Sequence, residues 1–187
     1  MLVRERARTS LSCVNGVPGK SAVSVQFNLA GDTLTARFEV CGRKPFVNSN
    51  LPTNASVQGL WDFDVVELFL SVDPNPASTH YFEFQVSPLN QFFELEIFEP
   101  RKKMNSKYSS GFRHNVMQLS NTSWQADMRI SLDALGFNSQ SNHNINYLRG
   151  GAFAILGETA ARTYWALNLP KQSVPDFHLP EFFNPIF

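Results

Sequence analysis

The sequence has little charge, and it has no long apolar run. Sixteen Lys and Arg residues balance sixteen Asp and Glu residues in a chain of 187. Proteins that bind nucleic acids or anionic membranes usually carry an excess of positive charge. No apolar run approaches the roughly 20 residues that a membrane-spanning helix needs. The composition therefore argues against a nucleic-acid partner and against insertion into a membrane.

Cysteine is almost absent, and a signal peptide is not visible. Cys13 and Cys41 are too few for a disulfide scaffold and lack CxxC spacing, so two free thiols are favoured and a single bridge stays open. The segment 1–10 (MLVRERARTS) has charges but no apolar stretch behind them. This favours an intracellular protein, and export stays open if the chain is a processed form.

Motifs for chemistry are also missing. The sequence contains no HExxH, GxSxG, GxGxxG or P-loop pattern, and its histidines are scattered at positions 80, 114, 143 and 178. We therefore nominate no catalytic residue and no required cofactor, and an enzyme is the least favoured class of function.

The chain is instead rich in aromatic residues and in the alternation of apolar and polar residues that marks half-buried strands. Phe alone occurs 17 times. Alternation is clearest at 23–29, 34–40, 66–72, 81–87 and 123–130. Eight or nine strands with almost no helix predict an all-β antiparallel β-sandwich. We expect one domain over 1–187, with 1–20 as an N-terminal extension.

The same alternation divides the side chains into a core and an outward face. Trp124 falls in register with apolar neighbours, and so do Phe93, Leu95 and Ile97, so all four are core candidates. Acidic residues fall at the alternate positions of neighbouring predicted strands: Glu67, Glu83, Glu94 and Glu96. These carboxylates suit a solvated sheet face or a site that hydrogen-bonds a polar ligand. Glycoside hydrolases also use a pair of carboxyl groups, one of which is a buried general acid. Nothing in the sequence marks any of these four residues as that acid.

Two tryptophans are placed where a ligand could reach them. Trp61 ends a long polar loop over 43–60, and Trp165 lies near the end of a predicted strand. Sugars lay the apolar face of their ring on aromatic planes, while carboxylates and amides bind their hydroxyls. The two indoles could therefore flank a sugar, or both could be packing residues.

Four segments in order resemble the family 9 carbohydrate-binding modules and their DOMON-like relatives. Residues 60–70 resemble the family's W-x-D-D-x-V-E-x-F strand, and 81–88 resemble its Y-x-F-E-V-N-P hairpin. Residues 124–135 are similar to its W-x-A-E-I-x-I-P-x-x-x-L segment. Residues 164–168 and 175–183 together resemble its C-terminal signature, which contains P-D-F-H-x-P-E-x-F. The resemblance covers about 21–187 and implies a β-sandwich that binds a mono- or oligosaccharide without catalysis.

The resemblance also implies the site residues. A sugar would lie between Trp61 and Trp165, with Glu67 accepting a hydroxyl and with Gln85, Ser87 and Asn168 as further polar contacts. The family pattern has Arg and Asn where Gln85 and Ser87 stand, so this chain lacks a charged fork there. Some relatives hold structural calcium, for which the acidic candidates are Asp62, Asp64 and Asp73.

Two alternatives stay open beside sugar binding. The first is an interaction module of the same fold that has lost its sugar site and binds another protein. The second is a haem-binding DOMON-type domain, for which the candidate ligands are Met117, Met128, His80 and His114. We expect His178, within the C-terminal signature, to fasten that segment by a hydrogen bond rather than to contact ligand.

Overall fold

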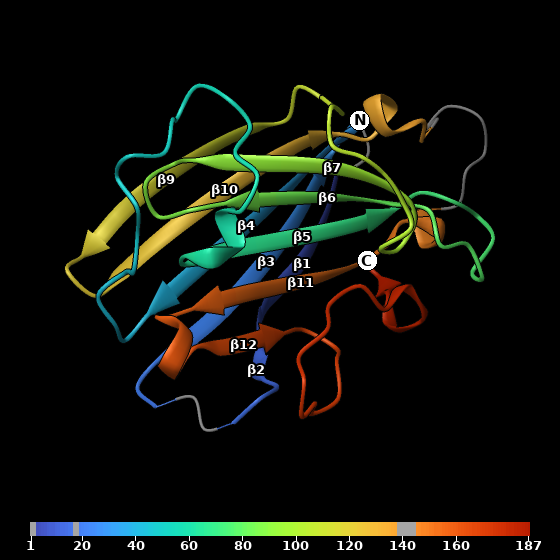
Figure 1. Ribbon diagram of the computed structural model, residues 1–187. Helices are drawn as coiled ribbons and strands as arrows, with labels where there is room; N and C mark the ends of the chain where they lie inside the picture. The colour runs from blue at the N-terminus through green and yellow to red at the C-terminus, as the bar shows by residue number, and fades with distance from the viewer. Residues whose placement is uncertain (1–2, 17–18, 138–144) are drawn as a thin grey trace.

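Two antiparallel β-sheets pack face to face (Figure 1). The computed structural model describes residues 3–16, 19–137 and 145–187. The first sheet has the strand order β1 (Val3–Ser10), β3 (Ala22–Ala30), β4 (Thr33–Cys41), β10 (Ser123–Ser131), β9 (Arg113–Ser120). The second sheet has the order β2 (Ser12–Cys13), β12 (Thr163–Ala166), β11 (Arg149–Leu156), β5 (Val65–Ser71), β6 (Tyr81–Val86), β7 (Phe92–Glu99), β8 (Lys103–Asn105), and β13 (Asn184–Pro185) pairs with β11. The predicted antiparallel β-sandwich is confirmed.

Helical structure in the described part of the chain is limited to turns of 3-10 helix, each three residues long. They are η1 (Leu60–Asp62), η2 (Asp133–Leu135), η3 (Ile145–Tyr147), η4 (Thr159–Ala161) and η5 (Pro180–Phe182). None of the helices in the described residues is long and apolar enough to cross a membrane.

The main hydrophobic core lies between the two sheets. Its members come from alternate positions of the strands, as on β5, where Val66, Leu68 and Leu70 are fully buried. Trp124 is 1% exposed in this core, which confirms its predicted place. Each fully buried large apolar side chain contributes roughly 1.5–3 kcal/mol to folding. This interior is what holds the two sheets together.

The N-terminal residues belong to the sandwich. β1 pairs with β3 at the edge of the first sheet, while Cys13 on β2 pairs with Trp165 in the second sheet. Leu11, between these two strands, is buried in the core. The prediction of an N-terminal extension over 1–20 is therefore wrong for 3–13, where polar alternation on an edge strand hid the strand signal. Cys13 and Cys41 are both free.

A second hydrophobic layer covers the outer face of the eight-stranded sheet. It is formed by the β5, β6, β7 and β11 side chains that point away from the main core, among them Phe69, Tyr81 and Phe153. The loop over 43–60 contributes Leu60 to this layer, and the C-terminal segment contributes Phe177 and Phe183. Both faces of the sheet are therefore covered by apolar side chains. The exception is a pocket that opens between the loop over 43–60 and the C-terminal segment.

The second layer reverses the predicted orientation of β7, whose apolar side chains face away from the main core. Phe93, Leu95 and Ile97 were predicted for the main core, but they lie on the outer face beside β6. Val86 pairs with Phe92 across the β6–β7 turn, so Phe93 falls on the same face as Gln85. Alternation alone does not reveal which face is which when both faces are apolar.

Candidate functional site

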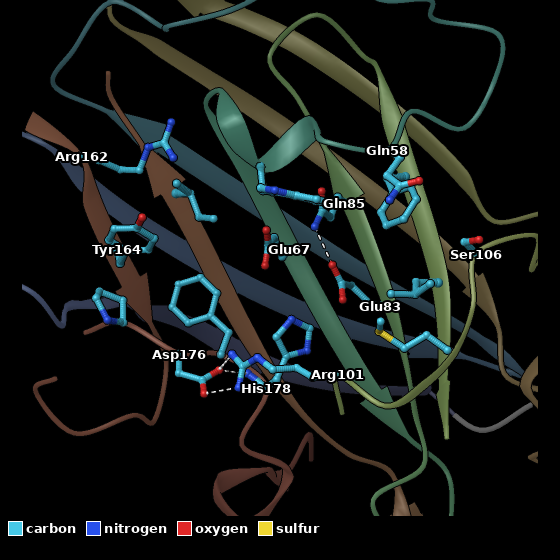
Figure 2. Close-up of a pocket in the computed structure, with 17 residues that line it drawn as sticks. Gln58, Glu67, Glu83, Gln85, Arg101, Ser106, Arg162, Tyr164, Asp176 and His178 are labelled. Carbon is cyan, nitrogen blue, oxygen red and sulfur yellow. Dashed lines mark hydrogen bonds and ion pairs between the residues drawn. The ribbon is translucent and has the colours of Figure 1, made fainter. Parts of the chain in front are cut away.

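A pocket of about 550 Å³ opens on the outer face of the eight-stranded sheet. In Figure 2, Glu67, Glu83 and Gln85 lie in the middle of the pocket, with Arg162 and Tyr164 on one side and Gln58 and Ser106 on the other. We call Glu67, Glu83 and Gln85 the polar floor. The aromatic and aliphatic lining comes from η1, β7, β11, β12 and the C-terminal segment: Trp61, Phe93, Leu95, Ile155, Tyr164 and Phe177.

Strand register brings the polar floor together. Glu67 on β5 pairs with Gln85 on β6, and Glu83 lies two residues before Gln85 on the same strand and face. Diagonal neighbours across an antiparallel pair are roughly 7–8 Å apart, within reach of long side chains. Glu94 and Glu96 were predicted to share this face, but they point to the opposite one, where Ser110 donates to Glu94 and His80 contacts Glu96 at 3.2 Å.

The polar floor is buried and only partly hydrogen-bonded. Glu67 and Glu83 are each 3% exposed, and Gln85 is 1% exposed. Gln85 Nε2 donates to Glu83 Oε1 over 2.5 Å, which leaves Glu83 Oε2 and Gln85 Oε1 buried with no partner. Glu67 accepts no hydrogen bond from any described residue. Buried polar groups without partners are costly and rare, so this floor has unused capacity for a ligand.

Burial shifts the ionisation of both floor carboxyls in the same direction. Burial raises the pKa of Glu67 well above its ordinary value, and the nearby charge of Glu83 raises it further. Burial also raises the pKa of Glu83 to about 7, against the opposing hydrogen bond from Gln85. Two close carboxyls with raised pKa values hold a proton near neutral pH. The floor can therefore present either a protonated or a charged pair.

The walls of the pocket are aromatic. Trp61 is half-buried and meets Phe93 edge to face, with ring centroids 5.6 Å apart. On the other side, Phe177 stacks on Phe153 at 4.5 Å, and Tyr164 meets Phe177 at 6.0 Å. Such contacts fix ring positions in advance, so the walls hold their shape without a ligand.

The C-terminal segment is fastened over the sheet by two polar contacts. Arg101, in the β7–β8 turn with φ +62°, forms a bidentate ion pair with Asp176 at 2.7 and 2.8 Å. His178 Nδ1 and the Tyr81 hydroxyl share a hydrogen bond of 2.6 Å. The predicted fastening role of His178 is confirmed, and His178 also lines the pocket. Burial lowers the pKa of His178, so its ring is neutral near pH 7.

Trp165 does not line the pocket, which corrects the expected pair of tryptophans. It is 3% exposed in the core between the sheets, and its indole nitrogen donates to Thr163 Oγ1. Side chains alternate along β12, so its neighbour Tyr164 is the residue that faces outward. The structure thus places Trp61, Glu67 and Gln85 together, with Tyr164 and Phe177 opposite Trp61 in place of a second indole.

Two further polar candidates lie outside the pocket. Ser87 is buried, accepts hydrogen bonds from the Leu89 and Gln91 amides, and donates to Gln91 Oε1. Gln91 in turn donates to the carbonyls of Asn48 and Leu51, so Ser87 helps to hold the loop over 43–60. Asn168 is exposed and does not line the pocket.

The acidic residues suggested for calcium are not brought together. Asp64 is buried and accepts hydrogen bonds from the Phe46 and Gly157 amides, with Arg43 at 3.8 Å. Asp73 lies beyond the far end of β5, and Asp62 is exposed. Calcium needs six to eight oxygens, and the described residues contain no cluster of three acidic, His or Cys side chains that could hold a metal. Asp64 is therefore a loop anchor.

The haem candidates are likewise dispersed. Met128 is buried in the main core, and Met117 is exposed on the other face of its sheet. His80 contacts Glu96, and His114 contacts Asn90. No described Met and His pair from this set lines the pocket.

Several residues that line the pocket or fasten its edge are not among the predicted site residues. Tyr164, Phe177 and Phe93 line the walls, and Arg101 fastens the C-terminal segment. Alternation along β12 shows that Tyr164 and Trp165 point to opposite faces of the sheet. It does not show which of these two faces packs against the other sheet. The contact of Arg101 with Asp176 spans 75 residues and left no local pattern.

Sequence comparison finds relatives of low identity. No protein-family profile matches the chain. Among curated proteins, it is 28% identical over 139 residues to the UPF0462 protein C4orf33 homolog of Danio rerio, covering 71% of this chain and 64% of that protein. The chain thus spans less than two thirds of that relative. It is also 26% identical over 171 residues to a protein of Arthroderma benhamiae named "Extracellular protein", covering 82% of this chain and 72% of that one.

Solved structures give the clearest likeness. A provisionally assigned carbohydrate-binding protein of Bacteroides uniformis superposes with a TM-score of 0.74 at 16% identity, covering 95% of this chain and 84% of that one. A family 9 carbohydrate-binding module of Caldicellulosiruptor kristjanssonii, solved with cellotriose, gives 0.64 at 13% identity, covering 95% and 80%. The same kind of module solved with glucose gives 0.61 at 13% identity, covering 94% and 82%. The chain therefore has the fold of the family 9 carbohydrate-binding modules.

Proposed function

We propose that this chain binds carbohydrate in the pocket on its eight-stranded sheet and catalyses no reaction on it. The observation that carries the proposal is the polar floor, where buried acceptors of Glu83 and Gln85 stand without partners between aromatic walls. A sugar ring has apolar C–H faces for such walls and hydroxyls for such a floor. The likeness to modules solved with cellotriose and glucose supports the same function.

The placement of the carboxyls supports binding rather than hydrolysis. Glycoside hydrolases place two carboxyls on either side of the bond that they cut. Here Glu67 and Glu83 come from adjacent strands and share one floor. We expect the ring to stack on Trp61, with Tyr164 and Phe177 closing the opposite wall.

Calorimetry on the whole chain tests the proposal. We expect heat from at least one member of a panel of neutral, acidic and amino sugars, with affinities from micromolar to millimolar, or about 4 to 8 kcal/mol. The absence of heat from every sugar at millimolar concentration would count against carbohydrate binding and favour an interaction module.

The variant Trp61→Ala locates the site. We expect it to weaken sugar binding by about tenfold or more, because a half-buried stacking ring is lost, while the fold is retained. Met117→Ala, on the exposed face of the five-stranded sheet, is the control and should bind normally. Equal affinity in Trp61→Ala and the parent chain would move the site away from this pocket.

A further inference from the structure

The hydrogen-bonding capacity of the polar floor is one-sided. Its one amide nitrogen, Gln85 Nε2, uses one of its two N–H groups on Glu83 Oε1, so at most one amide N–H is left for a ligand. The groups left over are the Glu67 carboxyl, Glu83 Oε2 and Gln85 Oε1, which accept hydrogen bonds when the carboxyls are charged. A hydroxyl supplies one donor together with lone pairs, for which the charged floor offers few donors. A group with several donors and no acceptor matches the floor better.

No cation in the described part of the chain forms an ion pair with the floor. Among the described residues, no Lys, Arg or His forms an ion pair with Glu67 or Glu83. The guanidinium of Arg101 is held by Asp176, and that of Arg162 donates to the carbonyls of Asp62 and Gly157. Two buried carboxylates without a counter-ion are strongly unfavourable, so the empty floor retains a proton near neutral pH, and a cationic ligand could take the place of that proton.

The walls suit the rest of such a ligand. Aromatic faces attract cations as well as the C–H faces of a sugar ring. Gln58, Ser106 and the hydroxyl of Tyr164 also line the pocket and can exchange hydrogen bonds with ring hydroxyls. The pocket thus combines an acceptor floor with a lining that offers both donors and acceptors.

We propose that the sugar bound here is an amino sugar, whose ammonium group lies on the floor formed by Glu67, Glu83 and Gln85. This inference rests on the proposed carbohydrate function and names the ligand class of the same pocket. The ammonium donates to the carboxylates, and the ring lies against Trp61. N-acetylation removes the charge and two donors, so an N-acetylated sugar loses this advantage.

The pH dependence has a definite sign. Below the raised pKa values the floor holds protons that an ammonium must displace, so amino-sugar affinity rises as pH increases from 5 to 7. The ionisable groups that line or closely face the pocket are Glu67, Tyr81, Glu83, Arg101, Arg162, Tyr164, Asp176 and His178. The two arginines stay charged and are held elsewhere, and burial lowers the pKa of His178, so we expect loss of a proton from the carboxyl pair to be the main change as the pH approaches 7.

Calorimetry with matched glycosides provides the test. The ligands are methyl glucosaminide, methyl glucoside, methyl N-acetylglucosaminide and cyclohexylamine, at pH 6.5 and low salt. We expect the glucosaminide to bind about tenfold more tightly than the glucoside, because charge-assisted hydrogen bonds are roughly twice as strong as neutral ones. In buffers of different ionisation enthalpy, only ligands that carry the amine should release protons on binding.

Glu67→Gln and Glu83→Gln identify the groups responsible. Each should reduce the ratio of glucosaminide to glucoside affinity towards one, whereas Glu158→Gln, an exposed control, should keep the parent ratio. If a floor variant does not fold, the affinity ratio and proton release of the parent chain decide the question alone.

The outcomes separate this inference from the proposed function. Glucoside binding with no gain for the glucosaminide overturns the amino-sugar inference and leaves carbohydrate binding in place. Cyclohexylamine binding as tight as the glucosaminide overturns it too, because the ring hydroxyls would then contribute nothing. Binding of none of the ligands, with no heat from the wider sugar panel, overturns both.

Discussion

The two faces of the eight-stranded sheet are built from the same strands, but one packs against the other sheet and the other carries the pocket. On β5, Val66, Leu68 and Leu70 point into the main core, whereas Val65, Glu67 and Phe69 point to the outer face. The inner side chains of β5 are all apolar and fully buried. The outer face keeps two buried carboxyls and unpartnered acceptors, which weaken the fold where they lie. The proposed binding site is therefore held on a sheet whose other face supplies the stability.

Trp165→Ala should give the largest effect, and on the inner face. Removing a buried indole from the main core leaves a cavity, so we expect the free energy of unfolding to fall by about 3–5 kcal/mol. Denaturant unfolding measures this directly. If stability were unchanged and sugar affinity lost, Trp165 would be a ligand contact and the assignment of the two β12 faces would be reversed.

Glu83→Gln should have a smaller effect, of opposite sign, on the outer face. The pKa of Glu83 is raised in the folded chain, so its protonated form favours folding at low pH, and that stability is lost as pH rises from about 4.5 to about 7. A neutral amide does not ionise, so the variant should gain roughly 2 to 3 kcal/mol over the parent chain at pH 8 and little at pH 4.

Thermal or denaturant unfolding at several pH values measures this difference. Glu158→Gln, on an exposed turn, is the control and should follow the parent curve. A Glu83→Gln curve parallel to that of the parent chain would mean that the floor carboxyls ionise normally and do not oppose folding.

Arg101→Ala should have the smallest effect. Its ion pair with Asp176 lies at the edge of the pocket and is largely exposed, so its loss should lower the free energy of unfolding by less than about 1 kcal/mol. Lys102→Ala, which removes the adjacent exposed pair with Glu99, gives the reference for a surface charge. A loss well above that of the Lys102 variant would show that the Arg101–Asp176 ion pair stabilises the fold more than an ordinary exposed pair does.

The same comparison explains how far the sequence could be interpreted. Alternation located the strands and the inner core, including Trp124, because hydrophobic spacing reflects burial directly. Trp61, Glu67 and Gln85 were brought into one pocket, as the family resemblance implied. Trp165 was wrongly predicted to line the pocket, because resemblance to a motif does not show which of two adjacent aromatic residues, Tyr164 or Trp165, faces outward.

The remaining differences have a similar cause. Phe93 and Leu95 were assigned to the inner core because an apolar side chain at a strand position gives no sign of a second apolar layer. That layer depends on the loop over 43–60 and the C-terminal segment, which reach the sheet through contacts distant in sequence. Local patterns do not encode such contacts.

The alternation of β5 side chains between the core and the pocket limits how this protein can be altered by engineering or by evolution. Substitution at Glu67 would change the lining of the proposed binding pocket and leave the neighbouring interior side chains as they are. Insertion or deletion of one residue in this strand would instead exchange its two faces and bring the Glu67 carboxylate into the interior. Ligand preference can therefore diversify through replacements at alternate positions, while the length of the strand must stay fixed.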